Sequence, residues 1–594
     1  MQRRAETNQA DGLTQDRDLF LRGCGLLDGD AAPWADKPAW HILETAFDRG
    51  LNFLATWHTW RNAPRRPGLL HFSSLQECAV SADDIRNSAA PFPELAGLAS
   101  QLAEQWRGML PGVQRLVLDG GLVQLTLHIG PLQELLPTLD AAVDSVFLDD
   151  ADSGANPDVW SAPLVKAVAR LCRPGTQLAS RWVAPAVQNH LASAGFELAG
   201  AHGQSSECSQ LRARYAPRWS TRAAARQTQA TASETAVVVG GGLAGSAVAY
   251  SLAQRGWHVT VLDRADQPAS GASALPAGMV APHVSPDDAL LSRLSRSGVR
   301  LTLQRASELL DHGTDWAPTG VLEHRVEGKR GLPRNEAWQQ WGADWSMEAS
   351  PEQRKAAHLP HNASALWHVN AGWIRPAQLV RAQLRHPRIG WQGGCHVGAL
   401  QRLERGWRLL NANGDVLAEA DHVVLASAWP TLGLVQALGE HGLPLHPLRG
   451  QISWGNMAAL PAAAQALLPP FPVNGHGALA HGMVGPDGAP GWFVGSTFDR
   501  GITEAVLRAQ DRQANLAKLQ GLLPELAQAM APAFDQAHDW AGVRCTLPDR
   551  VPAVGPLAPQ RLPGLHICTG LGARGLTLSV LCGELLAALL HGEP

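Results

Sequence analysis

Hydrophobic and polar positions alternate in a repeating order along both halves of the chain. Short apolar runs that end in acidic residues, such as "SVFLDD" (residues 145–150), precede longer segments with helical spacing, such as "APLVKAVARLC" (162–172). Strands that alternate with helices are typical of a mainly parallel sheet covered by helices. The pattern therefore predicts an α/β fold in each half.

A polar segment separates the two halves. Five arginines and no acidic residue lie between Arg212 and Arg226, and the following residues 228–235 are small and polar. Such composition marks a domain boundary, so we predict a first domain at 1–215, a linker at 216–235 and a second domain at 236–594. The arginine run fits a solvated linker, and it also fits a strip that faces RNA.

Length and composition narrow the class of protein. A chain of 594 residues is too long for a single hydrophobic core, so more than one domain is expected. A net charge of −4 argues against a wholly basic nucleic-acid surface. The eight cysteines include no CxxC pair, and neither a signal peptide nor an uncharged apolar stretch of about 18 residues is visible. We therefore expect a cytoplasmic protein, monomeric, with no membrane segment and no metal.

The second half opens with a dinucleotide-binding pattern. An apolar strand at 236–239 leads into Gly240, Gly242 and Gly245 at GxGxxG spacing, then a helix and a second strand that ends at Asp263. The glycines allow a tight turn, close approach of a pyrophosphate and close helix–strand packing, and the acid accepts the ribose hydroxyls. In this strand–turn–helix–strand context the motif predicts a bound dinucleotide.

Two later segments favour FAD over NAD. The strand-like "ADHVVLASAWP" (420–430) resembles the second nucleotide-side motif of flavoproteins, and "GLHICTGLGARGLTLSV" (564–580) reads as a strand, a glycine-rich turn and a helix. Backbone N–H groups at such a helix start can face the flavin or its phosphates. The predicted cofactor-binding residues of this turn are Gly570, Gly572, Arg574, Gly575, Leu576 and Thr577.

The second half as a whole resembles the group of glycine, sarcosine and D-amino-acid oxidases. The resemblance implies an FAD-binding dinucleotide fold with an inserted substrate domain, and oxidation of a carbon beside an amine. In such families an arginine at the start of a segment like "VRCTLPDRVPAVGP" (543–556) holds a substrate carboxylate, and the matching residue is Arg544. A structural ion pair is the alternative role for this arginine.

The first half looks like a class I methyltransferase with a Rossmann-like sheet. Its segment "PLQELLPTLDAAVDSVFLDD" (131–150) reads as helix, turn and apolar strand with terminal carboxylates. In that fold S-adenosylmethionine lies across the carboxyl ends of the strands at a switch point.

Together the halves resemble the bifunctional tRNA 5-methylaminomethyl-2-thiouridine biosynthesis family. The similar segments are "FLRGCGL" (20–26), "ETAFDRGLNFLATW" (44–57), "FLDDADSGANPDVW" (147–160), "GASALPAGMVAPHVSPDD" (271–288) and "GLGARGL" (570–576). The resemblance implies tRNA with a modified wobble uridine as partner. The flavin half then removes the carboxymethyl group of 5-carboxymethylaminomethyl-2-thiouridine, and the other half methylates the amine with S-adenosylmethionine.

The first half departs from the family's motifs at its ligand-facing positions. The family's E-x-GFGTGLNF keeps Glu44 and Gly50, which are predicted to bind S-adenosylmethionine, but has Ala46, Asp48 and Arg49 in place of glycine, glycine and threonine. A side chain in this turn obstructs the backbone's approach to the ligand.

Two further motifs of the first half also differ. The acid expected to grip the ribose aligns with Gln76, and Glu77 could replace it only by a one-residue slip to the other strand face. The third motif keeps Asp149, predicted to be catalytic, and residues 156–158, but its middle is rewritten.

Three functional hypotheses stay open on the sequence alone. In the first, the chain is a bifunctional tRNA-modifying enzyme whose methyl transfer is retained, weakened or lost. Alternatively, its first half only holds tRNA for the oxidase. In the third hypothesis the chain is a small-molecule glycine or amine oxidase with a vestigial first domain.

Overall fold

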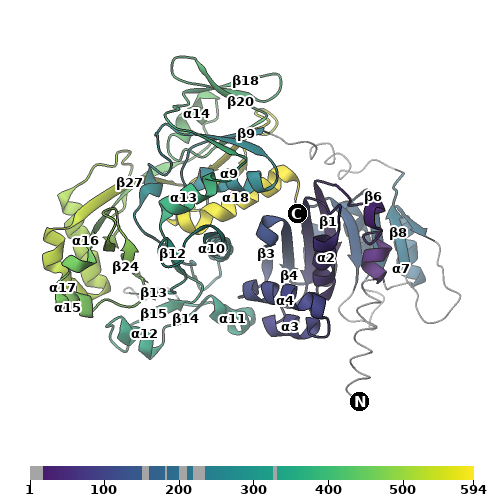
Figure 1. Cartoon of the computed structure of the whole chain (residues 1–594), viewed down its shortest axis with the longest axis horizontal. Coiled ribbons are helices and arrows are strands. Elements are labelled where there is room, and N and C mark those ends of the chain that lie inside the picture. The colour runs from purple at the N-terminus through teal and green to yellow at the C-terminus, as the bar shows by residue number, and fades with distance from the viewer. Residues whose placement is uncertain are drawn as a thin grey trace. The chain divides into compact units, whose positions relative to one another are not determined.

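A computed structural model of the chain describes residues 18–149, 160–180, 184–199, 211–218, 235–325 and 331–593. The chain divides into two compact units, Met1–Thr231 with Leu590–Pro594 (unit 1) and Ala232–Leu589 (unit 2) (Figure 1). The last five residues, assigned to the second domain on sequence grounds, thus belong to unit 1. Most of the predicted linker, 219–234, lies outside the described residues.

Unit 1 is built on an eight-stranded sheet of order β3-β4-β2-β1-β5-β6-β8-β7. Its strands are β1 (Ala39–Glu44), β2 (Leu69–Gln76), β3 (Gly112–Leu118), β4 (Val123–Ile129), β5 (Val143–Leu148), β6 (Cys172–Ser180), β7 (Phe196–Ala199) and β8 (Leu211–Tyr215). The central strands β4, β2, β1, β5 and β6 are parallel, and the outer strands β3, β8 and β7 pair antiparallel. The chain order reverses between β1 and β5, which makes this the switch point of the sheet.

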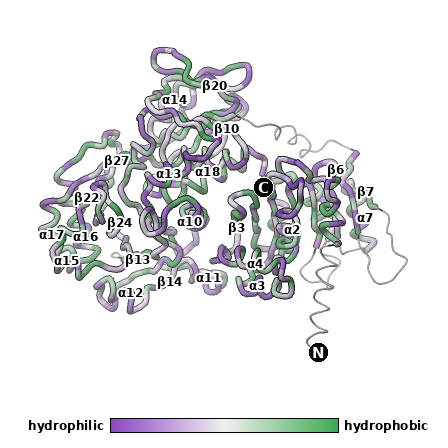
Figure 2. Tube along the Cα trace, viewed as in Figure 1, coloured by the Kyte–Doolittle hydropathy of each residue, from purple (hydrophilic) through white to green (hydrophobic). Residues whose placement is uncertain are grey.

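Helices form two hydrophobic layers with the sheet of unit 1. They are α2 (Leu51–Asn62), α3 (Ala82–Ala89), α4 (Pro93–Gln105), α5 (Leu132–Leu135), α6 (Ala162–Leu171) and α7 (Pro185–Ser193). Neighbouring residues of β1 point to opposite faces, so Ile42 joins the core with α2, α3 and α4, and Leu43 joins the core with α6 and α7. Hydrophobic residues, drawn green, occur throughout the elements of both units (Figure 2).

Unit 2 contains a six-stranded nucleotide-type sheet of order β17-β10-β9-β21-β29-β28. These strands are β9 (Thr235–Val239), β10 (His258–Leu262), β17 (Ile389–Gln392), β21 (His422–Leu425), β28 (Ala553–Pro556) and β29 (Leu565–Thr569). All neighbours are parallel except β28 and β29. The helices of this part are α9 (Leu243–Gln254), α10 (Leu290–Leu309), α13 (Pro376–Leu384), α14 (Thr431–Ala437) and α18 (Gly575–His591).

A second, nine-stranded sheet carries the inserted part of unit 2. It contains β13 (Val321–His324), β14 (Ser346–Glu348), β15 (Ala365–His368), β22 (His446–Asn456), β23 (Val473–Asn474), β24 (Ala478–Val484), β25 (Pro490–Gly495), β26 (Asp499–Arg500) and β27 (His538–Thr546). One small sheet contains β11 (Gly278–Val280), β12 (Trp316–Ala317) and β16 (Gly372–Ile374). Another contains β18 (Ala399–Arg402), β19 (Trp407–Leu410) and β20 (Val416–Ala420). The remaining helices are α11 (Glu336–Trp341), α12 (Pro351–Ala356), α15 (Ala462–Ala466), α16 (Ala509–Leu522) and α17 (Pro524–Asp535). The α/β prediction is confirmed in both units.

Among the residues that the structure describes, one helix is long and apolar enough to cross a membrane by length and composition. It spans Gly572–His591, and 67% of its apolar window is buried inside the protein. Its Glu584 carboxylate pairs with Arg255 at 3.0 Å and with Arg305 at 2.7 Å. Burial favours the neutral acid, but the two arginines more than offset it and lower the pKa of Glu584 to about 2. These contacts are those of a core helix.

Replacing Glu584 by glutamine is expected to destabilise unit 2 by about 3–5 kcal/mol, because two buried guanidinium groups lose their counter-charge. A lower midpoint of thermal unfolding measures this loss of stability. The matched variant Glu348→Gln removes an exposed acid from β14 and should leave the midpoint unchanged. Equal midpoints for both variants would contradict the role of this ion-pair cluster.

Candidate functional site

The glycines of the dinucleotide motif lie where β9 meets α9. Gly240 has a φ of +116°, and a Cβ on it would lie 2.6 Å from the carbonyl oxygen of Ala426 after β21. A Cβ on Gly245 would lie 1.8 Å from the carbonyl oxygen of Gly240. Gly242 is the N-cap residue of α9. The structure thus supports the turn and packing roles that the spacing predicts.

Asp263 follows β10 and reaches back to the glycine turn. Its Oδ2 accepts the N–H of Gly241 at 2.6 Å, and its Oδ1 accepts the N–H of Ala265 at 2.8 Å. The aromatic ring of Trp391 lies on the same turn, since a Cβ on Gly241 would approach it to 2.3 Å. The carboxylate is therefore fixed beside the motif, where a ribose hydroxyl can donate to it.

Ser273 is a member of this site that the sequence reasoning missed. Its hydroxyl accepts the N–H of Leu243 at 3.0 Å, and a Cβ on Gly242 would approach the same oxygen to 3.0 Å. Ser273 belongs to the segment "GASALPAG" (271–278), from which the sequence analysis named no site residue. A hydroxyl residue within a segment of small residues was the available signal.

The predicted C-terminal turn lies between β29 and α18. Gly572, Arg574 and Thr577 line a cavity of unit 2, whereas Gly570, Gly575 and Leu576 are not among its lining residues. A Cβ on Gly575 would contact Leu243 at 3.3 Å, so the first residues of α18 and α9 are close neighbours. The structure brings the two glycine-rich segments together, as a flavin-binding role requires.

The arrangement fits FAD. The glycine turn leaves room for a pyrophosphate at the start of α9, Asp263 is placed for a ribose, and the C-terminal turn borders the cavity. Gly240, Gly242, Gly245 and Asp263 would hold the dinucleotide.

The cavity has a volume of about 1100 Å³ and is lined mainly by strands of the nine-stranded sheet, by β11 and by the turn before α18. Arg544 of β27 faces it. The guanidinium donates only to the Ser496 hydroxyl and the Thr497 carbonyl, each at 3.3 Å, and pairs with no acidic residue that the structure describes. Burial lowers the pKa of Arg544 to about 10, which leaves it charged at neutral pH. Such a cation can bind a substrate carboxylate through two N–H groups.

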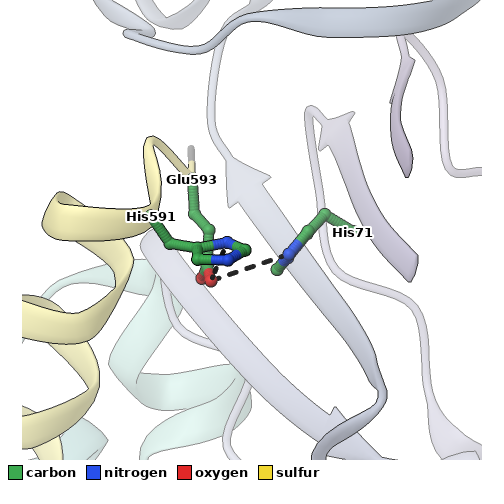
Figure 3. Close-up of side chains that lie close together, drawn as sticks. All are labelled: His71, His591 and Glu593. Carbon is green, nitrogen blue, oxygen red and sulfur yellow. Dashed lines mark ion pairs between the residues drawn. The ribbon is translucent and has the colours of Figure 1, made fainter. Parts of the chain in front are cut away.

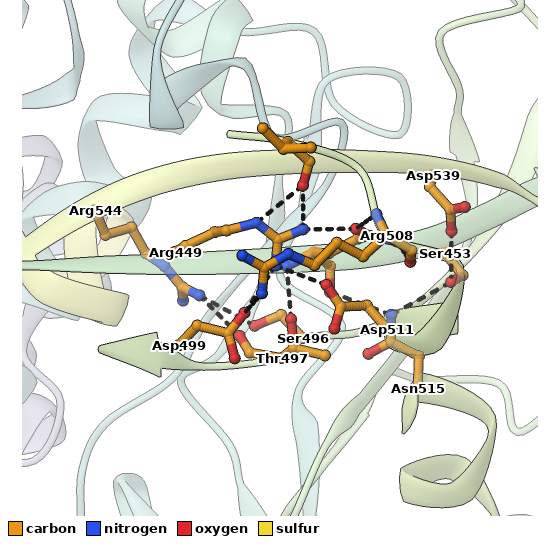
Figure 4. A network of polar contacts seen from close by, with 12 residues as sticks. Arg449, Ser453, Ser496, Thr497, Asp499, Arg508, Asp511, Asn515, Asp539 and Arg544 are labelled. Atoms are coloured by element: carbon orange, nitrogen blue, oxygen red, sulfur yellow. Dashed lines mark hydrogen bonds and ion pairs between the residues drawn. The ribbon is translucent and has the colours of Figure 1, made fainter. Parts of the chain in front are cut away.

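A buried polar network holds the loop that contacts Arg544 (Figure 4). Arg449 of β22 is fully buried and donates to Asp499 at 2.8 Å and to Asp511 at 2.6 Å. Its Nε also donates to the carbonyl oxygen of Val506 at 2.9 Å. These bonds fix residues 497–508, which supply part of the cavity wall.

Lys518 of α16 is a second cation in the cavity that the sequence reasoning missed. Its Nζ donates to the carbonyl oxygen of Ser496 at 2.6 Å. Burial and the charge of Arg544 lower the pKa of Lys518. Both cations lie near the ring of exposed Phe498, at 4.7 Å for Arg544 and 5.1 Å for Lys518.

The predicted residues of unit 1 meet at the switch point of its sheet. Glu44 ends β1, and Asp149 follows β5, the parallel neighbour. The Thr45 hydroxyl donates to the carbonyl of Asp149 at 2.7 Å and accepts the N–H of Asp149 at 2.9 Å. Burial raises the pKa of Glu44 to about 8, even though the Ser74 hydroxyl donates to its Oε2 at 2.7 Å.

The turn after β1 is filled by aromatic packing. Phe47 is buried and stacks on Trp106 with 5.2 Å between ring centroids. Gly50 has a φ of +78°, and a Cβ on it would lie 2.7 Å from the ring of Phe47. Asp48 has a φ of +47°, a conformation that glycine adopts more readily. The side chains of Asp48 and Arg49 are exposed, whereas Ala46 and Phe47 are buried.

Gln76 stands at the end of β2, where the family has an acid. Its Nε2 donates to the carbonyl oxygen of Asp48 at 3.2 Å, and its buried Oε1 has no hydrogen-bond donor among the described residues. Glu77 is exposed, so it does not take the place of Gln76. The amide oxygen remains as a neutral acceptor for one ribose hydroxyl.

These residues fit S-adenosylmethionine. Glu44 has a buried Oε1 with no hydrogen-bond partner among the described residues, and this oxygen can accept an ammonium group. Glu44, Gln76 and the turn to Gly50 would hold the cofactor, with Asp149 beside them. Residues 150–159, including the retained 156–158 of the third motif, lie outside the described residues.

Gln76→Glu is expected to tighten S-adenosylmethionine binding by about tenfold, because a carboxylate makes stronger, charge-assisted hydrogen bonds to both ribose hydroxyls. Calorimetric titration of the wild type and the variant measures the change. The matched variant Glu77→Gln alters the exposed neighbour and should bind as the wild type does. Unchanged affinity for Gln76→Glu would show that the ribose does not reach this residue.

A buried carboxylate also occurs at the C-terminal end of unit 1. Glu593 pairs with Arg115 at 3.1 Å, and its other oxygen lies 3.6 Å from His71 and 3.7 Å from His591 (Figure 3). The ligand atoms of His71, His591 and Glu593 lie within 4.8 Å of one another, a spacing that a metal could span. Arg115 already neutralises the carboxylate, so we interpret the group as an ion-pair cluster.

Two sequence families match the chain. The family described as FAD dependent oxidoreductase matches residues 235–589, and the S-adenosyl-L-methionine-dependent methyltransferase family matches residues 93–215. Both predicted cofactor classes are thereby confirmed.

Curated relatives match nearly the whole chain. The tRNA 5-methylaminomethyl-2-thiouridine biosynthesis bifunctional protein MnmC of Paracidovorax citrulli is 49% identical and covers 98% of this chain and 93% of its own. The protein of the same name from Polaromonas naphthalenivorans is 48% identical, with 98% and 91% covered. Among solved structures, glycine oxidase from Geobacillus kaustophilus is 20% identical, covers 61% of this chain and 96% of its own, and has a TM-score of 0.48.

Proposed function

The chain belongs to the tRNA 5-methylaminomethyl-2-thiouridine biosynthesis bifunctional protein family, and from this membership we propose that it modifies the wobble uridine of tRNA in two steps. Unit 2 removes the carboxymethyl group from 5-carboxymethylaminomethyl-2-thiouridine. Unit 1 methylates the aminomethyl group that remains.

In the first step the carboxymethyl carbon beside the amine loses a hydride, and the amine becomes an imine. Bound FAD supplies the acceptor for the hydride. Water adds to the imine, the carbon–nitrogen bond breaks, and glyoxylate leaves the aminomethyl group on the uridine. Arg544 binds the carboxylate through two N–H groups, and Lys518 adds a second positive charge. The two cations thus hold the substrate by its carboxylate, which is the end of the modified side chain farthest from the uracil ring.

In the second step the primary amine attacks a methyl group. Bound S-adenosylmethionine supplies that methyl group. Glu44 and Gln76 orient the cofactor at the ends of β1 and β2, and Asp149 at the end of β5 accepts the proton that the amine releases. Asp149 is held at this position by the two hydrogen bonds to Thr45.

The observation that carries the proposal is the buried guanidinium of Arg544, which has no described acidic partner and faces the cavity beside the FAD-type fold. It supplies a counter-charge for a carboxylate, and the carboxymethylamino group is a glycine-like unit that carries one.

The test is incubation of the purified protein with tRNA that carries 5-carboxymethylaminomethyl-2-thiouridine, followed by nucleoside mass spectrometry. We expect the aminomethyl nucleoside without S-adenosylmethionine and the methylaminomethyl nucleoside with it. If the reaction stops at the aminomethyl nucleoside both with and without S-adenosylmethionine, unit 2 is an active oxidase and unit 1 only holds the tRNA. Oxidation of free N-alkylglycines without action on tRNA would support a small-molecule amine oxidase instead.

A further inference from the structure

The cavity of unit 2 concentrates positive charge in a chain whose net charge is −4. Its lining contains five lysine and arginine side chains and one acidic side chain, Glu323. The cations are Arg500, Lys518, Arg544, Arg550 and Arg574. One carboxylate of a substrate needs at most two of them, so the cavity carries more positive charge than the modified side chain alone requires.

The strand register places Arg500 and Arg544 on the same side of the sheet. Leu448 of β22 pairs antiparallel with Arg500 of β26 on one flank and with Arg544 of β27 on the other. Residues directly opposite each other in antiparallel strands point to the same face, and all three residues line the cavity. The next residue, Arg449, pairs with Asp499 and Val543 and points to the opposite face.

This register also sets the separation of the two arginines. They lie two strand spacings apart, which is about 10 Å. In a nucleotide whose base carries a carboxymethylaminomethyl group, the carboxylate and the 5′-phosphate are on the order of 10 Å apart, given bond lengths of about 1.5 Å. One nucleotide can therefore reach Arg544 with its carboxylate and Arg500 with its phosphate.

Arg500 and Arg550 are available for such a contact. Both are exposed, and neither forms an ion pair or a side-chain hydrogen bond with a residue in the described part of the chain. Asp499, the acid next to Arg500, is instead engaged by Arg449 at 2.8 Å on the opposite face (Figure 4). Arg550 lies in the turn that follows β27, six residues after Arg544, and lines the same cavity.

We propose that Arg500 and Arg550 form a phosphate-binding rim, which holds the RNA backbone at the wobble nucleotide while Arg544 holds the carboxylate. The inference rests on the proposed oxidation of a tRNA-borne carboxymethylamine. A phosphate contact adds affinity that an isolated nucleoside cannot gain, so the rim makes the oxidase selective for the polynucleotide.

The test compares two substrates in the FAD-loaded full-length protein. The double variant Arg500→Gln/Arg550→Gln and the wild type are assayed on tRNA that carries 5-carboxymethylaminomethyl-2-thiouridine and on the free nucleoside. We expect the ratio of kcat/KM for tRNA to that for nucleoside to fall about tenfold or more, through KM, because two phosphate contacts are lost. The matched variant Arg293→Gln removes an exposed arginine of α10 outside the cavity and should leave the ratio unchanged.

Salt dependence of tRNA binding tests the rim without turnover. The slope of log Kd against log salt should fall by about 1–1.5 in the double variant, by about 0.7 for each lost contact to single-stranded RNA. An unchanged slope and an unchanged substrate ratio would overturn the rim. Absence of turnover on both substrates in the wild type would instead overturn the proposed oxidation, while the binding slopes still decide whether the rim contacts RNA.

Discussion

Replacing Arg544 by alanine is expected to lower kcat/KM for removal of the carboxymethyl group by about 10²- to 10⁴-fold. The substitution removes two charge-assisted hydrogen bonds to the substrate carboxylate, each worth about 1.5–3 kcal/mol. The neighbouring cation Lys518 donates to the carbonyl oxygen of Ser496, and an ammonium group cannot present a planar pair of donors. Rates of aminomethyl formation on modified tRNA measure the loss.

Arg544→Lys separates charge from geometry. It keeps the positive charge but loses the two-pronged contact, so its kcat/KM should fall between those of the wild type and Arg544→Ala. Methylation of tRNA that already carries the aminomethyl group is the internal control, because Arg544 belongs to unit 2. Full carboxymethyl removal by Arg544→Ala, accompanied by a lower unfolding midpoint, would instead establish the purely structural role that the sequence left open.

The parts of the site that the sequence predicted are those encoded by contiguous segments. Gly240, Gly242 and Gly245 occur within six residues, and their roles follow from a local strand–turn–helix geometry. Asp263 follows at the end of the next strand, so its position depends only on the parallel pairing of β9 and β10. Such short-range order is readable from spacing alone.

Residues missed by the sequence reasoning depend on long-range register. Ser273 meets Leu243 from 30 residues away, and Lys518 meets Ser496 from 22 residues away. Arg449 meets Asp511 from 62 residues away, and its strand β22 pairs with β25 and β27 in one register. Neither the strand partners nor the side chains that share a face are visible without that register.

The turn after β1 shows a different limit of sequence reasoning. The replacement of two glycines by Ala46 and Asp48, and of a threonine by Arg49, predicts an obstructed cofactor site. The structure shows Asp48 in a positive-φ conformation, which glycine adopts more readily than aspartate. Whether a non-glycine residue adopts such a conformation depends on its surroundings, here the packing of Phe47 on Trp106.

Gly245→Val is expected to abolish FAD binding, and with it the colour and the oxidase activity of the protein. Even the first atom of a side chain at this position would lie 1.8 Å from the carbonyl oxygen of Gly240, so α9 must move away from β9. That movement dismantles the turn that receives the pyrophosphate. Flavin absorbance of the purified protein measures the loss, and S-adenosylmethionine binding by unit 1 should persist.

Two alanine variants separate loss of the cofactor from loss of the fold. Gly242→Ala places a Cβ 3.0 Å from the movable Ser273 hydroxyl, so unit 2 should fold and yet bind FAD more weakly, because the methyl group occupies the phosphate approach. Gly433→Ala in α14 meets nothing within 4 Å and should bind FAD as the wild type does, since alanine favours a helix. If Gly242→Ala and Gly433→Ala hold equal amounts of FAD, the pyrophosphate does not lie at the start of α9. The two substitutions add the same methyl group, so any difference between them reports on the cofactor's position.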